Sequence, residues 1–70
     1  MRLKELREIN MKTQIEISNF LNIKQNTYSQ YETCQRQIPI NLLIKLSQFY
    51  NVSVDYILGL TDVDIPYPRQ

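Results

Sequence analysis

The sequence has no histidine, no tryptophan, one cysteine and one glycine among its 70 residues. A single cysteine cannot form an intramolecular disulfide, and the common zinc-binding patterns need histidine or several cysteines, so apolar packing must stabilise the fold. Glycine-rich phosphate loops, clustered metal ligands and paired catalytic carboxylates are missing as well. We therefore expect neither an enzyme nor a bound cofactor, and no small-molecule substrate.

Long apolar runs are also absent. No stretch approaches the roughly 20 residues of a membrane-spanning helix. The N-terminal segment MRLKELREIN lacks the uninterrupted apolar core of a signal peptide. A chain of this length buries only about 60% of the surface that its unfolded form exposes, which leaves no room for a second core. These features predict one cytoplasmic domain with no membrane partner and no attached sensor domain.

Charge is nearly balanced, with eight basic and seven acidic residues and a net charge of +1. Residues 1–36 hold six basic and four acidic side chains, a balance of +2, whereas residues 37–70 hold two basic and three acidic ones, a balance of −1. The basic excess in the first half is compatible with an anionic partner, but ordinary surface scatter explains it equally well.

Apolar residues recur at helical spacing through the first sixty residues, which predicts an all-α chain of five short helices. The first helix is expected over residues 2–9. The second begins at Thr13, which can form a capping box with Glu16, and ends at Asn22 in the left-handed conformation. The apolar positions of these two helices are Leu3, Leu6, Ile9, Ile17, Phe20 and Leu21.

A third helix is predicted to follow at once. Ile23 can pack on Tyr28 as a hydrophobic staple. Lys24 stands at the cap position and offers no acceptor, so the first backbone amides of this helix are left without partners. Such a helix end suits an anion such as phosphate.

The fourth helix is predicted over residues 39–50 and the fifth from the Ser53 cap to Leu58, with Gly59 closing it. Residues 61–70 contain two of the three prolines and are predicted to form an extended tail beyond a domain of residues 1–60. The expected buried face of the fourth helix consists of Ile40, Leu43, Leu46, Ser47 and Tyr50, and the apolar residues outside that face are Leu42, Ile44 and Phe49.

The stretch NIKQNTYSQYE, residues 22–32, has an unusual polar face. On a helical wheel Tyr28, Tyr31 and Thr27 share one side. Solvated faces usually carry Lys and Glu, which form helices better than Asn or Ser. Carboxamides instead match the N7 and N6 groups of adenine in the major groove. The residues on the polar side, whose alternative interpretation is a plain solvated surface, are Gln25, Asn26, Ser29, Gln30 and Thr33.

The chain resembles the Cro and phage-repressor (Xre-type) helix-turn-helix regulators. The resemblance rests on TQIEIS at 13–18, LNI at 21–23, YSQYE at 28–32, and then IPINLLIKLS and NVSVDYILGLTD. It implies a lambda-repressor-like bundle in which the second helix crosses the phosphate backbone of double-stranded DNA and the third lies in the major groove. It also implies the base-reading residues, which are Gln25, Asn26, Gln30 and, less centrally, Ser29.

The resemblance implies backbone contacts as well. It places an ion pair between Arg7 and Glu32, which would also present the guanidinium to a phosphate, although two unrelated surface charges are the alternative. Ser18 falls where relatives have a small residue between the second and third helices. After Glu32 the family commonly has an Asn-Gly pair that forms a left-handed turn. This chain has Thr33-Cys34 at these positions, so the left-handed turn is in question. The other expected phosphate contacts are Gln14, Lys24, Thr33, Gln35 and Arg36.

Taken together, these patterns predict a sequence-specific DNA-binding regulator, a repressor that acts as a homodimer on half-sites about 34 Å apart. The alternative is a protein-interaction module, antitoxin-like or regulatory, that uses the same fold and an apolar interface. Three segments are candidate dimer contacts: the apolar residues of the fourth helix outside its buried face, the fifth helix around Tyr56, and the Ile65–Tyr67 tail. The alternative for the fourth helix is that Leu42 and Phe49 complete the core.

Overall fold

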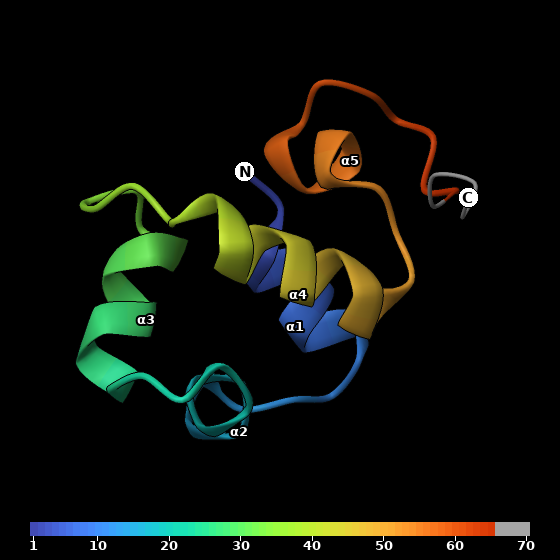
Figure 1. Ribbon diagram of the computed structural model, residues 1–70. Helices are drawn as coiled ribbons and strands as arrows, with labels where there is room; N and C mark the ends of the chain where they lie inside the picture. The colour runs from blue at the N-terminus through green and yellow to red at the C-terminus, as the bar shows by residue number, and fades with distance from the viewer. Residues whose placement is uncertain (66–70) are drawn as a thin grey trace.

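The computed structural model describes residues 1–65, which contain five α-helices and no strand (Figure 1). The predicted all-α class with five short helices is confirmed. The helices are α1 (Leu3–Ile9), α2 (Gln14–Leu21), α3 (Gln25–Glu32), α4 (Ile40–Tyr50) and α5 (Val54–Leu58).

Local capping explains where several of these helices begin and end. The Thr13 hydroxyl accepts a hydrogen bond from the Glu16 backbone N–H at 3.1 Å, and the Glu16 carboxylate accepts one from the Thr13 N–H at 3.0 Å. This is the predicted capping box at the start of α2. Ser53 caps α5 by accepting from Tyr56 N–H at 3.1 Å, and Gly59 ends α5 with a φ of 81°. These predictions of capping are confirmed.

Four residues other than glycine adopt the left-handed conformation. Asn22 ends α2 with a φ of 58°, as predicted, and Asn51 ends α4 in the same way. Cys34 has a φ of 61°, so the left-handed turn after α3 forms without a glycine. Met11, between α1 and α2, has a φ of 57° although its side chain is 89% exposed and makes no compensating core contact. A residue with a Cβ is strained in this conformation.

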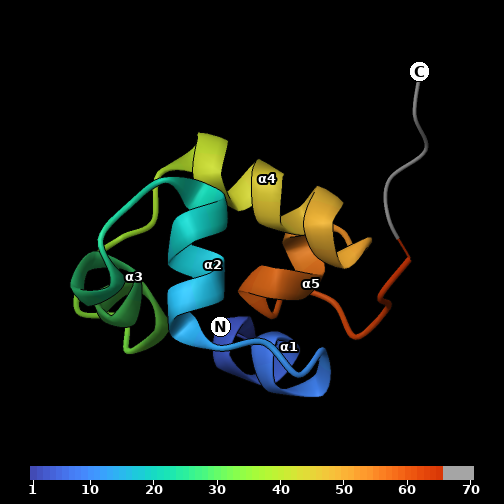
Figure 2. The same ribbon diagram turned by 90° about the horizontal axis from the view of Figure 1, so that it is seen from below.

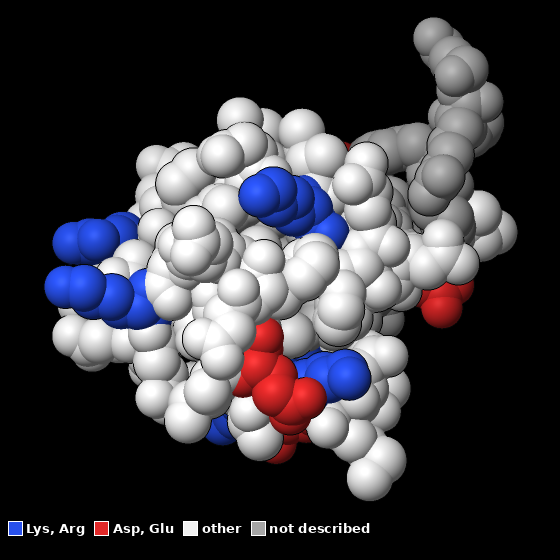
Figure 3. Space-filling model, turned by 60° about the horizontal axis from the view of Figure 1, so that its bottom comes forward, with Lys and Arg blue, Asp and Glu red and all other residues white. Residues whose placement is uncertain are grey.

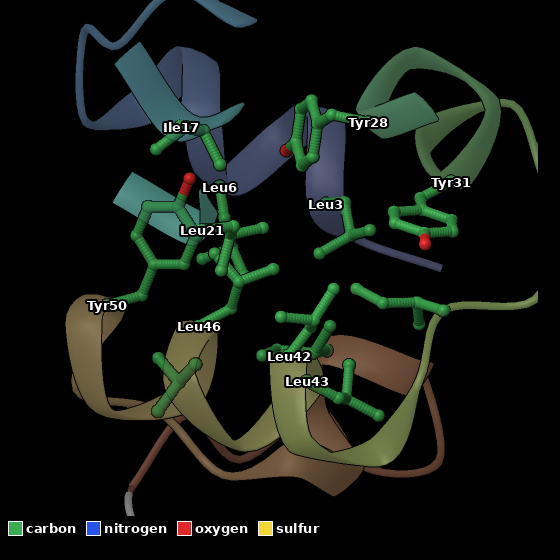
Figure 4. Close-up of a cluster of buried hydrophobic side chains, with 13 residues drawn as sticks. Leu3, Leu6, Ile17, Leu21, Tyr28, Tyr31, Leu42, Leu43, Leu46 and Tyr50 are labelled. Carbon is green, nitrogen blue, oxygen red and sulfur yellow. The ribbon is translucent and has the colours of Figure 1, made fainter. Parts of the chain in front are cut away.

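The core lies where the five helices converge (Figure 4). Its most deeply buried side chains come from all five helices, which ties the whole of the sequence from α1 to α5 to one apolar cluster. These side chains are Leu3 of α1, Ile17 of α2, Tyr28 of α3, Leu46 of α4 and Ile57 of α5.

The structure corrects the predicted core at four positions. Ile9 is 69% exposed because successive three-residue steps from Leu3 drift 60° each around the helix and carry it off the buried face. Phe20 is 45% exposed at the edge of the α2 stripe. In α4 the buried face is turned toward Leu42, which is buried, while Ile40 in the first turn is 69% exposed.

Arg2 ties the two ends of the domain together. Its backbone N–H donates to the Ile57 carbonyl at 2.8 Å, and its guanidinium donates to the Tyr56 and Thr61 carbonyls at 2.7 and 2.8 Å. The guanidinium also pairs with Asp62 at 2.7 Å and lies 4.4 Å from the centre of the Tyr56 ring. The segment that follows α5 therefore leaves the domain from a fixed point.

Residues 61–65 contain no helix, whereas the rest of the predicted 61–70 tail, including Tyr67, lies outside the described residues. Within residues 1–65, no helix is long and apolar enough to cross a membrane.

Candidate nucleic-acid interface

The turn between α2 and α3 brings these two helices into close contact. Ser18 is only 2% exposed, and its hydroxyl donates to the Ile15 carbonyl at 2.9 Å within its own helix. The Ser18 carbonyl accepts the Ile23 N–H at 3.0 Å, across the left-handed Asn22. A small side chain at this position allows the close packing of α2 and α3 that Figure 2 shows from below.

Two tyrosines anchor α3 to the core. Tyr28 is fully buried and Tyr31 is 5% exposed. Because successive residues turn by 100°, the predicted base-reading residues lie on the other side of the helix. Gln25 and Asn26 in the first turn are exposed, whereas Ser29 and Gln30 are half-buried. The structure thus places these four side chains on one face of α3. The two most exposed to solvent lie at its N-terminal end.

The beginning of α3 has no side-chain cap. Lys24 is exposed and has extended backbone angles (φ −72°, ψ 145°). Its carbonyl accepts the Tyr28 N–H at 3.1 Å, but its side chain accepts no hydrogen bond from the first amides of α3. In Figure 3 basic side chains project from the edge of the molecule on the side where Figure 1 places α3. The uncapped amides and the Lys24 charge give the N-terminal end of α3 a positive potential.

The loop after α3 folds back on the helix. The Thr33 hydroxyl donates to the Ser29 carbonyl at 3.1 Å, so its proton is already used at the helix end. The backbone N–H groups of Gln35 and Arg36 both donate to the Gln30 carbonyl, at 2.9 and 3.3 Å. Thr33, Gln35 and Arg36 are all exposed, and the loop carries them beside the C-terminal end of α3.

A buried ion pair fixes α3 against α1 and α2. Arg7 Nε donates to Glu32 Oε2 at 2.7 Å and its Nη2 to Oε1 at 3.3 Å. The side chains are only 14% and 3% exposed. Gln14 Nε2 donates to Glu32 Oε1 at 3.1 Å, and Arg7 Nη1 donates to the Lys12 carbonyl at 3.0 Å. The structure therefore brings Arg7, Gln14 and Glu32 together, one from each of the first three helices.

The electrostatics follow from this geometry. Burial alone would raise the pKa of Glu32, but the Arg7 guanidinium, followed by the nearby Tyr28 hydroxyl and the Gln14 amide, outweighs it and holds the pKa below its ordinary value. Burial raises the pKa of the Tyr28 hydroxyl, and the nearby Glu32 carboxylate adds to the effect. Burial, with a further contribution from Glu32, raises the pKa of Tyr50 to about 12. All of these groups keep their ordinary charge at neutral pH.

Sequence reasoning missed two parts of this network. Gln14 was expected to contact phosphate, but not to donate to Glu32. The hydroxyls of Tyr28 and Tyr50 are buried and have no hydrogen-bond partner among the described residues. The spacing of these tyrosines in the sequence does not indicate that their hydroxyls are buried. Within residues 1–65, no group of three or more Cys, Asp or Glu side chains is placed to hold a metal ion.

Comparison with known proteins places this geometry in a family. Residues 3–57 match the family described as Helix-turn-helix. The chain is 47% identical over 62 residues to the HTH-type transcriptional regulator ImmR of Bacillus subtilis (strain 168), covering 89% of this chain and 49% of the relative. It is 39% identical over 61 residues to the uncharacterized HTH-type transcriptional regulator YobD of the same strain, covering 87% of this chain and 54% of the relative.

The chain spans about half the length of these curated relatives. No solved structure matches it. The family match covers α1 to α4 in full and all but the last residue of α5, and it includes the α2–turn–α3 unit that carries the polar face. The chain belongs to the helix-turn-helix family of the Cro and phage-repressor (Xre) type, as the sequence resemblance predicted.

Proposed function

We propose that this protein is a sequence-specific regulator of transcription that binds double-stranded DNA with α3 in the major groove. The observation that carries the proposal is the division of α3 into a buried tyrosine side and an exposed carboxamide side. The names of both curated relatives support a regulatory role, since each is an HTH-type transcriptional regulator. A helix held rigidly by its inner face can present its outer face to base edges.

Base reading is assigned to the exposed face of α3. Gln25 and Asn26 are the most accessible and lie at the end of α3 that approaches the groove first. Gln30 and Ser29 lie further along, and their partial burial restricts the rotamers they can adopt. A carboxamide donates and accepts at once, which suits the N6 and N7 groups of adenine.

The phosphate backbone is assigned to groups that flank this face. Lys24 is exposed at the uncapped start of α3, and Arg36 is exposed in the loop beyond its end. Gln14 uses one amide hydrogen on Glu32 and keeps the second for a phosphate oxygen. These contacts would fix the register of α3 on the duplex without selecting the sequence.

Repression and dimerisation complete the proposal. A protein that occupies an operator can repress by occupancy alone, whereas activation needs a further productive contact. A single α3 reaches few base pairs, so useful specificity calls for two copies on half-sites separated by one helical turn of about 34 Å.

The test begins with duplexes selected from a random pool. Fluorescence anisotropy then compares a selected duplex with a scrambled one for Gln25→Ala and Gln30→Ala. Each change should weaken binding to the selected duplex by roughly 1–3 kcal/mol, about 5- to 150-fold, with little effect on the scrambled one. Asn10→Ala, which removes an exposed carboxamide at the end of α1, should leave the ratio unchanged. Equal losses on both duplexes would contradict base reading by α3.

Salt dependence tests the backbone contacts. Lys24→Ala and Arg36→Ala should weaken binding to every duplex and reduce the slope of log K against log salt by about 0.9 each. Lys4→Ala, a change of the same charge on the exposed surface of α1, serves as the control. A slope equal to that of the wild type would remove the altered residue from the interface.

A further inference from the structure

An open aromatic groove lies between α2 and α4. Phe20 of α2 and Phe49 of α4 are 45% and 39% exposed, and their ring centres are 4.6 Å apart. With Lys45 and Gln48 they line a hollow of about 360 Å³. This volume is at the lower end of the range of ligand-sized pockets. Phe49 also lies edge-on to the buried Tyr50, with 5.1 Å between ring centres, so the core holds the pair in place while its outer faces stay open to another group.

The charge at the rim of the groove restricts what can cover it. None of the ion pairs among residues 1–65 includes Lys45, so its ammonium group has no acidic partner there. The long apolar stem of lysine can lie along the aromatic rings while the charge stays at the rim. The groove therefore suits apolar side chains that come with a carboxylate.

The segment after α5 has this chemistry. Val63 and Ile65 are 55% and 68% exposed, and Asp64 between them is exposed and belongs to none of the ion pairs among the described residues. Asp62 differs, because Arg2 binds it at 2.7 Å. The Arg2 anchor thus holds the base of the segment, and residues 63–65 project beyond it with two apolar side chains and one free carboxylate.

We propose that residues 63–65 of one copy of the chain dock in the Phe20–Phe49 groove of a second copy, and that the exchange is reciprocal. Asp64 of each copy then faces Lys45 of the other, while Val63 and Ile65 cover the aromatic rings. Both views show residues 61–65 apart from α2, which carries Phe20, so a second copy is the occupant rather than the same chain (Figures 1 and 2).

The proposed exchange gives a two-fold dimer in which the same surfaces meet twice. Neither the groove nor residues 63–65 includes a residue of α3, and the last turn of α4 and the segment after α5 lie at the other end of the molecule from that helix (Figure 1), so the exchange does not use its polar face. The inference supplies the interface for the dimer in the proposed function and rests on that part of it. A small interface of this kind predicts association that depends strongly on protein concentration.

Charge reversal tests the pairing in trans. In Lys45→Asp an acidic groove would face the acidic segment, and in Asp64→Lys a basic groove would face a basic segment. Sedimentation velocity at low ionic strength should show each variant dimerising at least roughly tenfold more weakly than wild type, because two pairs are reversed in every dimer. Lys4→Asp makes the same charge change on α1 and should dimerise like wild type.

The decisive sample is an equimolar mixture of the two variants. In a mixed dimer Asp64 of one chain meets Lys45 of the other, and the new lysine meets the new aspartate, so both pairs are attractive again. The mixture should dimerise about as well as wild type although each variant alone does not. A monomeric wild type, or a dimer that neither substitution weakens, would overturn the proposal, and so would a mixture that stays as weak as its components.

Failure here is distinguishable from failure of the proposed function. Binding to a duplex with a single half-site needs only α3 and no second copy. If Gln25→Ala lowers the selected-to-scrambled ratio on a single half-site while the wild-type chain stays monomeric, base reading stands and the segment exchange is wrong.

Discussion

Replacing Glu32 by Ala removes the carboxylate on which α1, α2 and α3 converge. Arg7 would keep its hydrogen bond to the Lys12 carbonyl but lose both bonds to Glu32, and Gln14 would lose its acceptor. The Arg7 side chain is only 14% exposed, so water replaces the lost partner incompletely. The variant therefore leaves a largely buried charge without its counter-ion.

The expected cost is about 3 kcal/mol in the free energy of unfolding. Removing one member of a buried pair typically costs 3–5 kcal/mol, and the retained bond to Lys12 favours the lower end of that range. A chain of 70 residues has a total stability of roughly 3.5–10 kcal/mol at 0.05–0.15 kcal/mol per residue. Glu32→Ala should thus remove at least about 30% of the stability of the domain.

Urea denaturation followed by circular dichroism measures this cost. Glu8→Ala removes an exposed acid from α1 that belongs to no ion pair among residues 1–65, and it should stay within about 0.5 kcal/mol of wild type. If the two variants proved equally stable, the Arg7–Glu32 pair would not hold the three helices together.

The same pair predicts a pH dependence. The pKa of Glu32 is lowered in the folded state, so the unfolded chain takes up a proton at higher pH than the folded one. The stabilisation from Glu32 is fully present above its ordinary pKa of 4.5 and is lost as the pH falls through the lower, folded value. Urea midpoints of wild type and Glu32→Gln should therefore converge as the pH is lowered below about 4.5. A gap that stays constant there would refute the sign of the shift.

Two further variants test strain and burial. Met11→Gly should stabilise the domain by about 0.5–1 kcal/mol in the same denaturation assay, because Met11 has a φ of 57° and an exposed side chain. Met11→Ala keeps the Cβ and should bring no such gain, and equal effects would argue against backbone strain. Tyr50→Phe should stabilise it by about 1 kcal/mol, because the Tyr50 hydroxyl is buried without a partner among the described residues. A less stable Phe variant would show that this hydroxyl makes a bond in solution.

Local signals predicted the helix boundaries well because each depends on a few neighbouring residues. The Thr13–Glu16 capping box, the left-handed Asn22 and the Ser53 cap all arise within four residues of sequence. Burial was predicted less well, because it depends on which neighbour occupies each side of a helix. Leu42 is buried in one core cluster with Ile38 of the preceding loop, whereas Ile40, which was expected inside, is exposed.

The candidate site shows the same division. Spacing alone places Tyr28 and Tyr31 opposite the carboxamides of α3, and the structure has this arrangement. The pairing of Arg7 with Glu32 came from the family resemblance, because no local pattern connects residues 25 positions apart. The link from Gln14 to Glu32 could not be foreseen by either route, since it depends on the angle at which α2 crosses α3.

Burying the Arg7–Glu32 pair costs desolvation energy, so its main contribution here is to orient α3 rather than to stabilise the fold. Apolar contacts tolerate small rotations, whereas the two hydrogen bonds from Arg7 fix the position of Glu32 at the end of α3. Replacing both partners by apolar residues, as in Arg7→Met combined with Glu32→Leu, should cost much less stability than Glu32→Ala alone. If α3 reads bases as proposed, this double variant should fold and yet discriminate poorly between selected and scrambled duplexes, because a base contact requires placement within about 0.5 Å. A double variant that retained full discrimination would show that Tyr28 and Tyr31 alone orient the helix.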